Sequence, residues 1–224
     1  MGLRLAYYYS SFITGCVSIF LSVVLLFAVN SSQPDKNELF LPYYIFLKMQ
    51  LALPIFELIL SFTSQRVDPT LVVVASMCGR VPIVFSVIRP EYSVLTLVLA
   101  ILYGLGDVLK ATYAADKIDV GTSSNLVAWV RYHTPMWFYP VTSLGGELPV
   151  LIRHIHSLLP YTMERRFWTQ FALMYYSLFP LLYFIHCLLY YRNVNRPKIY
   201  TEHLTAYNAY LQKQKKEQNS VTEE

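Results

Sequence analysis

Charged side chains are scarce in this chain. Only 14% of its 224 residues are charged, whereas soluble domains contain about 25%. Hydrophobic residues make up 55%, and the mean hydropathy is +0.39. This balance argues against an ordinary soluble enzyme, and nucleic acid is not an expected partner. The composition therefore predicts a membrane protein.

Cysteine is also scarce, and its placement excludes several kinds of site. The three cysteines, Cys16, Cys78 and Cys187, are widely spaced and lie within apolar stretches. This pattern fits neither a disulfide framework nor a zinc site. None of them is followed by arginine six positions later, so a cysteine-dependent phosphatase is not expected. The sequence offers no cluster of metal ligands, and no metal is predicted.

Six apolar segments have about the length that a membrane-spanning helix needs. They are 8–29, 41–62, 71–88, 93–113, 125–152 and 168–191. Four residues, 89–92, separate the third and fourth segments and predict a tight turn. We therefore expect an all-α polytopic membrane protein whose six transmembrane helices surround an intramembrane cavity. Residues 1–191 form this membrane domain, and residues 192–224 form a polar tail.

Basic residues predict the orientation in the membrane. With six spans, ten lysines and arginines lie on the side that holds both termini, and five lie on the other side. Six of the ten belong to the tail after residue 191. Because cytosolic loops carry the excess of basic residues, we expect both termini in the cytosol.

The stretch 131–148, RYHTPMWFYPVTSLGGEL, combines polar and helix-breaking residues inside the fifth span. Arg131 and Glu147 are charged, and Pro135 and Pro140 predict a kinked or partly unwound helix. A charged side chain near the bilayer centre costs about 2.5–3.5 kcal/mol, so these two need partners or water. We expect this stretch to line the cavity.

Other charged residues within the spans have a structural interpretation as well as a functional one. Glu57 in the second span and Arg80 in the third predict a buried ion pair. Asp107 and Lys110, three residues apart in the fourth span, can pair along the helix. Lys110 and Arg131 are expected near the same membrane face. Together they predict a basic mouth for a phosphorylated ligand.

Tyr139 and Glu147 are the candidate catalytic residues. A carboxyl group in an apolar cavity can exchange protons, and a phenol beside it can donate a hydrogen bond or relay a proton. A structural interpretation stands beside this one. Tyr139 is then one of many membrane tyrosines, and Glu147 is an interfacial carboxylate.

The order of several motifs resembles one known family. The fifth span contains Arg131-Tyr132, then Tyr139-Pro140, then Gly146-Glu147-Leu148, and upstream lie Gln50, Ala52, Glu57 and Gly79-Arg80. The chain is similar in these positions to the membrane 3-hydroxyacyl-CoA dehydratases, also called protein-tyrosine-phosphatase-like A proteins. These enzymes carry out the third step of very-long-chain fatty acid elongation.

The chain departs from that family at two places. The family's Trp-x-x-Thr-Glu-x-x-Arg-Tyr element is represented by Tyr103, Gly106, Asp107, Lys110 and Ala111. A lysine in place of arginine loses bidentate recognition of phosphate or carboxylate. Tyr139 and Glu147 are eight residues apart instead of seven. On a regular helix the extra residue leaves Glu147 about 80° from Tyr139. An unwound turn or bulge at Pro140 and Gly145-Gly146 can absorb it.

The resemblance implies a lyase that dehydrates long-chain (3R)-3-hydroxyacyl-CoA to trans-2-enoyl-CoA in the endoplasmic reticulum membrane. It assigns the acid and base functions to Tyr139 and Glu147 as a pair. It does not say which residue is the acid and which is the base. No cofactor is implied, because loss of water changes no oxidation state. The expected partners are the acyl-CoA substrate, membrane lipid and other elongation enzymes.

Two alternatives remain at the level of the sequence. The altered fourth span and the extra residue favour a catalytically inactive homologue that binds acyl-CoA or acts as a scaffold of the elongation machinery. Intramembrane charges alone also permit a small transporter or channel. The six spans show no evident internal repeat of the kind that many transporters carry, which argues against the last of these.

Overall fold

The computed structural model describes residues 2–28, 36–61, 80–119, 130, 136–194 and 205–214, and every regular element within them is helical. The all-α part of the prediction is thus confirmed for these residues. The elements are α1 (Gly2–Ala28), α2 (Lys36–Ser61), η1 (Ile83–Val87), α4 (Val94–Asp119), η2 (Val141–Glu147), α6 (Leu148–Ser157) and α7 (Met163–Val194). Residues 80–82, 136–140 and 205–214 are also helical.

Two of the described helices are long and apolar enough to cross a membrane. They contain the segments Leu5–Phe27 and Val94–Ala115, with mean hydropathies of 2.2 and 1.8. They correspond to the first and fourth predicted spans. The helices α2 and α7 also coincide with predicted spans, whereas half of 71–88 and part of 125–152 lie outside the described residues. Six spans therefore remain a prediction.

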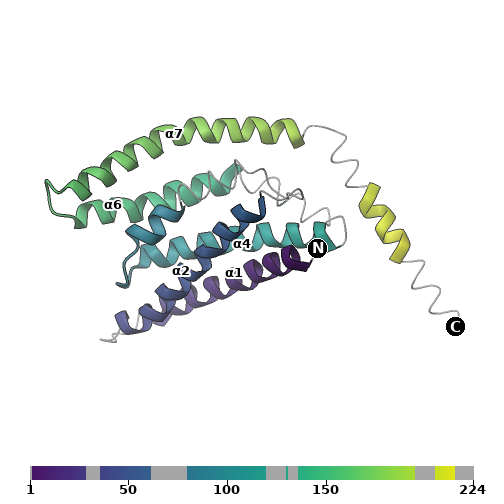
Figure 1. The fold of residues 1–224 in the computed structure, drawn as a ribbon, viewed down its shortest axis with the longest axis horizontal. Coiled ribbons are helices and arrows are strands. Elements are labelled where there is room, and N and C mark those ends of the chain that lie inside the picture. The colour runs from purple at the N-terminus through teal and green to yellow at the C-terminus, as the bar shows by residue number, and fades with distance from the viewer. Residues whose placement is uncertain are drawn as a thin grey trace.

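Helices α1 and α4 form the most extensive contact in the described part of the chain, and Figure 1 shows them side by side. Two glycines permit this close approach. A Cβ atom added at Gly104 would lie 2.9 Å from the backbone oxygen of Gly15 and 2.8 Å from Cγ1 of Ile19. Small residues at helix crossings are the usual means of close packing between membrane helices. The crossing therefore depends on the absence of side chains at both glycines.

We expect Gly104→Ala to destabilise the protein by about 1–3 kcal/mol, because a backbone oxygen cannot move aside and the two helices must separate. Gly145→Ala is the matched control, since an added Cβ there meets no atom within 4 Å. The free energy of unfolding in mixed detergent micelles measures both. Equal stabilities of the two variants would contradict a tight crossing at Gly104.

Both π-helical turns follow a proline. Pro82 precedes η1 and Pro140 precedes η2. Proline lacks an N–H group, and its ring displaces the carbonyl four residues earlier, so it disturbs the regular i→i−4 pattern. In these turns the backbone bonds span five residues instead, as from the Ile88 N–H to the Ile83 oxygen at 2.9 Å. The helix predicted to be kinked or partly unwound instead continues through Pro140 as a wider helical turn, and Pro135 lies outside the described residues.

The remaining helices pack on two sides of η2. Residues 136–157, which include η2 and α6, pack against α4, and α7 runs back along α6 after a short turn at 158–162 (Figure 1). The predicted turn between the third and fourth spans is present as the non-helical residues 88–93. A buried apolar cluster connects α2, η1, α4 and α6, with Leu47, Ile83, Leu97, Leu99 and Leu151 almost fully buried. This arrangement places η2 between α4 and α7.

Candidate functional site

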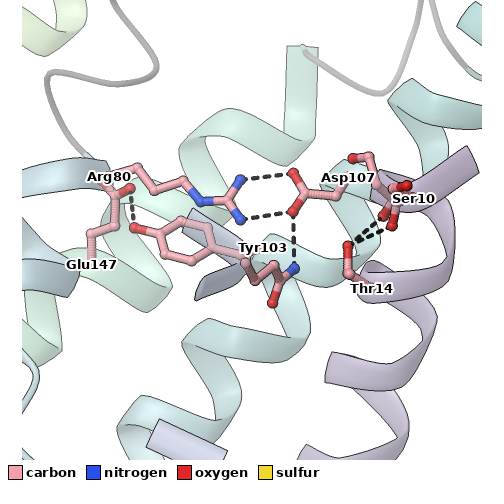
Figure 2. Close-up of polar contacts among 8 residues, drawn as sticks. Ser10, Thr14, Arg80, Tyr103, Asp107 and Glu147 are labelled. Atoms are coloured by element: carbon pink, nitrogen blue, oxygen red, sulfur yellow. Dashed lines mark hydrogen bonds and ion pairs between the residues drawn. The ribbon is translucent and has the colours of Figure 1, made fainter. Parts of the chain in front are cut away.

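Glu147, the last residue of η2, is buried and is bound by two phenols. Its side chain is 5% exposed. The Tyr103 hydroxyl of α4 donates to Glu147 Oε1 at 2.8 Å, as Figure 2 shows. The Tyr175 hydroxyl of α7 donates to Oε2 over a longer distance of 3.4 Å. Two helices from opposite sides therefore hold the carboxyl group.

An ion pair lies next to this carboxyl group. Arg80 donates from Nη1 to Asp107 Oδ1 and from Nη2 to Oδ2, each at 2.7 Å (Figure 2). Gln50 Nε2 of α2 also donates to Asp107 Oδ2, at 3.0 Å. The two charged side chains are only 13% and 15% exposed. A planar two-point contact of this kind fixes both partners more firmly than a single hydrogen bond would.

Arg80 joins the ion pair to the phenol. Its Cζ atom lies 4.3 Å from the centre of the Tyr103 ring, within the range of a cation–π contact. Gln50, Asp107, Arg80, Tyr103 and Glu147 thus form a continuous series of contacts, which we call the polar column. Its members come from α2, residues 80–82, α4 and η2.

The structure gives mixed outcomes for the predicted site residues. Tyr139 is partly buried in the helical turn just before η2, and Lys110 is partly buried on α4. Arg131 lies outside the described residues, so the basic mouth is not described. The side chain of Glu57 is also outside them. The carboxylate that engages both terminal nitrogens of Arg80 belongs to Asp107.

The π-helical turn lies between the two predicted catalytic residues. A π turn contains one residue more than an α turn, because its bonds join residues five apart. The eight-residue separation of Tyr139 and Glu147 therefore takes about two helical turns, as seven residues do in a regular helix. Ser143, midway between them, is also buried. By this general geometry, a π turn offsets one extra residue between two positions that share a helix face.

Helix α7 supports this turn. The Ser143 carbonyl accepts the π-type bond from the Leu148 N–H, and it also accepts a hydrogen bond from the Tyr176 hydroxyl at 3.1 Å. Tyr183 donates to the carbonyl of Met136, one turn before η2. The two hydroxyls of α7 thus bind one backbone oxygen within the turn and one just before it.

Sequence reasoning did not identify Tyr103 and Tyr175 as partners of Glu147. One signal was available for Tyr103, because it precedes Asp107 by four residues and therefore shares its helix face. No comparable signal marked Tyr175, which is one of 19 tyrosines. Its role depends on how α7 packs against η2.

A second polar group, His154, lies beyond the predicted end of the fifth span. Its side chain is 5% exposed, and its ring meets Trp168 edge to face at 5.6 Å. Burial lowers the pKa of His154, and the positive charge of Arg89 lowers it further, whereas Glu164 has the opposite effect. Folding therefore favours the neutral form of His154.

The pKa of His154 predicts a loss of stability in acid. An unfolded histidine takes up a proton below a pKa of about 6.5, and the folded protein resists this uptake. Stability is therefore fully present above about pH 6.5 and declines as the pH falls below it. Unfolding midpoints at pH 7.5 and 5.5 measure the effect. His154→Gln should reduce the pH dependence, whereas substitution of the exposed His156 should not. An unchanged pH dependence in His154→Gln contradicts this assignment.

Within the described ranges, no group of three or more His, Cys, Asp or Glu side chains is arranged to hold a metal ion. The chemistry available at the site is that of a buried carboxyl group, the phenols around it and an adjacent ion pair. Comparisons with protein-family models, curated proteins and solved structures found no match to the chain.

Proposed function

We propose that this chain is a membrane-embedded dehydratase of long-chain (3R)-3-hydroxyacyl-CoA. The observation that carries the proposal is the π-helical turn between Tyr139 and Glu147. The resemblance of the sequence to the dehydratase family was weakest at this spacing. A π turn takes up one residue more than an α turn. Two residues that are eight apart can therefore share a helix face, as residues seven apart do in a regular helix.

The proposed reaction needs an acid and a base on one face of a buried site. The C2–H bond of the acyl chain breaks, a C2–C3 double bond forms, and the C3–O bond breaks. The base takes the C2 proton, and the acid protonates the departing hydroxyl to give water. Tyr139 and Glu147 together perform these proton transfers, which need neither an oxidant nor a reductant.

In this proposal the chain has six spans around an intramembrane cavity in the endoplasmic reticulum membrane, with both termini in the cytosol. The apolar composition and the two long apolar helices support the membrane setting. The coenzyme A phosphates contact Lys110 and Arg131 at the cytosolic mouth, while the acyl chain extends between the helices. The neighbouring elongation enzymes supply the substrate and consume the product.

A second candidate function is a non-catalytic homologue that binds acyl-CoA or acts as a scaffold. One observation favours it: both oxygens of Glu147 accept hydrogen bonds from the protein's own phenols. A carboxyl group in that state can serve to hold α4, η2 and α7 together.

The direct test is conversion of (3R)-3-hydroxyacyl-CoA to the enoyl-CoA by the purified full-length protein in detergent. Several chain lengths are assayed, and the product is identified by mass spectrometry. The dehydratase proposal predicts conversion above a matched membrane-protein blank. No conversion at any length, combined with measurable binding of the acyl-CoA, would establish the scaffold function instead.

Deleting Gly145 tests whether the turn compensates for the extra residue. This glycine is exposed and has open space around it, so its loss should convert the π turn into an α turn. We expect the deletion variant to keep at least a third of the activity. An alanine inserted after Gly145 should lower activity at least 100-fold, because it turns Glu147 by about 100°. Loss of activity in a folded deletion variant would contradict the compensation.

A further inference from the structure

We propose that Tyr103 is a positioning residue that holds the Glu147 carboxyl group for proton transfer, and that Arg80 and Asp107 fix the Tyr103 ring for this task. The inference rests on the proposed function and extends it to the polar column. None of these three residues needs to contact the substrate.

The contact between Tyr103 and Glu147 is the shorter of the two that hold this carboxyl group. The Tyr103 bond is 2.8 Å long, whereas the Tyr175 bond is 3.4 Å long. Both Tyr103 and Glu147 are 5% exposed, so little water competes for the bond. A hydrogen bond in such surroundings is electrostatically stronger than in water. Tyr103 therefore largely determines where Oε1 lies.

Tyr103 itself is held from its ring face. Arg80 lies over the ring, and its guanidinium plane is fixed by the two bonds to Asp107 (Figure 2). Asp107 is anchored in turn by Gln50. Because Tyr103 and Asp107 are one helical turn apart on α4, the contacts form a closed loop through that helix. Rotation of the phenol away from Glu147 would break the contact with Arg80.

This geometry affects the protonation of Glu147 as well as its position. A phenol donates most strongly to an ionised carboxylate, so the bond favours the charged form over the neutral acid. Removing the hydroxyl of Tyr103 should leave a larger fraction of Glu147 protonated at a given pH. That change can be measured without any catalytic turnover.

The test is the rate at which dicyclohexylcarbodiimide labels Glu147. This reagent enters apolar regions and reacts with protonated carboxyl groups, and peptide mass spectrometry locates the adduct. The full-length protein is labelled in detergent at pH 7. We expect Tyr103→Phe to increase the rate of labelling at Glu147 at least fivefold. The phenylalanine ring preserves the surface that Arg80 covers.

Tyr43→Phe is the matched control. Tyr43 is 4% exposed, and its hydroxyl forms a 2.6 Å bond with Ser22, so the same group is lost from a similarly buried tyrosine. Neither residue belongs to the polar column, and the labelling rate at Glu147 should stay within twofold of native. If Tyr103→Phe is not monodisperse, Arg80→Lys replaces it, because lysine lacks the planar fork. At least twofold faster labelling is then expected.

The outcomes separate this inference from the proposed function. Unchanged labelling in the folded Tyr103 variant, or labelling increased equally by Tyr43→Phe, would overturn the inference. If the native chain dehydrates its substrate, Tyr103→Phe should also lower kcat at least tenfold with KM within about twofold. A rise in KM as large as the fall in kcat would overturn the positioning role. If the native chain shows no dehydration but labelling depends on Tyr103, the hold on Glu147 stands and only the proposed reaction fails.

Discussion

Glu147→Gln is expected to lower kcat for dehydration by about 10²–10⁴-fold, the range that a positioned acid or base contributes. Glutamine has nearly the same shape and can still accept the hydrogen bond from Tyr103. It cannot take up or release a proton in the reaction. The loss should therefore appear in kcat, with the protein still folded. Initial rates of enoyl-CoA formation measure it.

Glu164→Gln is the matched control for this substitution. Glu164 is 59% exposed and lies at the start of α7, away from the polar column. Its replacement should leave kcat within about twofold of native. Tyr139→Phe should show a loss comparable to that of Glu147→Gln. If Glu147→Gln retains native kcat, Glu147 is not the acid or base, and the assignment of the pair is wrong.

Asp107→Ala is expected to destabilise the protein by about 3–5 kcal/mol, the usual cost of removing one partner of a buried ion pair. Arg80 would then carry an unpaired positive charge, although its side chain is only 13% exposed to solvent. Gln50 would also lose the acceptor for its amide group. Unfolding in mixed micelles, followed by helical circular dichroism, measures the change.

Removing both charges distinguishes the effect of an unpaired charge on stability from the effect of side-chain packing. Arg80→Met combined with Asp107→Leu replaces the pair by apolar side chains of similar size, and such replacements are often neutral or stabilising. The double variant should therefore recover most of the stability that Asp107→Ala loses. Stability as low as that of Asp107→Ala would show that the shape of the pair, and not the unpaired charge, is what the fold requires.

The helices were predictable because their signals are local. The apolar runs of 5–27 and 94–115 each suffice for a helix, and the tight turn before the fourth span followed from four residues. The disturbance at Pro140 was predictable for the same reason. The form of that disturbance depends on α7, since the Tyr176 hydroxyl binds the Ser143 carbonyl.

The partners of the charged residues were harder to predict. The sequence contains Glu57 and Asp107 as possible carboxylates for Arg80, and only the packing of α4 against residues 80–82 places Asp107 beside it. The resemblance identified Tyr139 as a catalytic candidate, whereas it gave Tyr103 only as the counterpart of the family's tryptophan and not as a partner of Glu147. Helix periodicity defines which residues share a face. It does not define which faces of separate helices meet.

The hold of α7 on η2 has a consequence for biosynthesis. Glu147 receives one hydroxyl from α4, which is translated before it, and another from α7, which is translated last among the long helices. A nascent chain that has reached residue 157 already contains the carboxyl group and Tyr103 but lacks both Tyr175 and Tyr176. The carboxyl group and the turn that carries it receive these two hydroxyls only after α7 has left the ribosome.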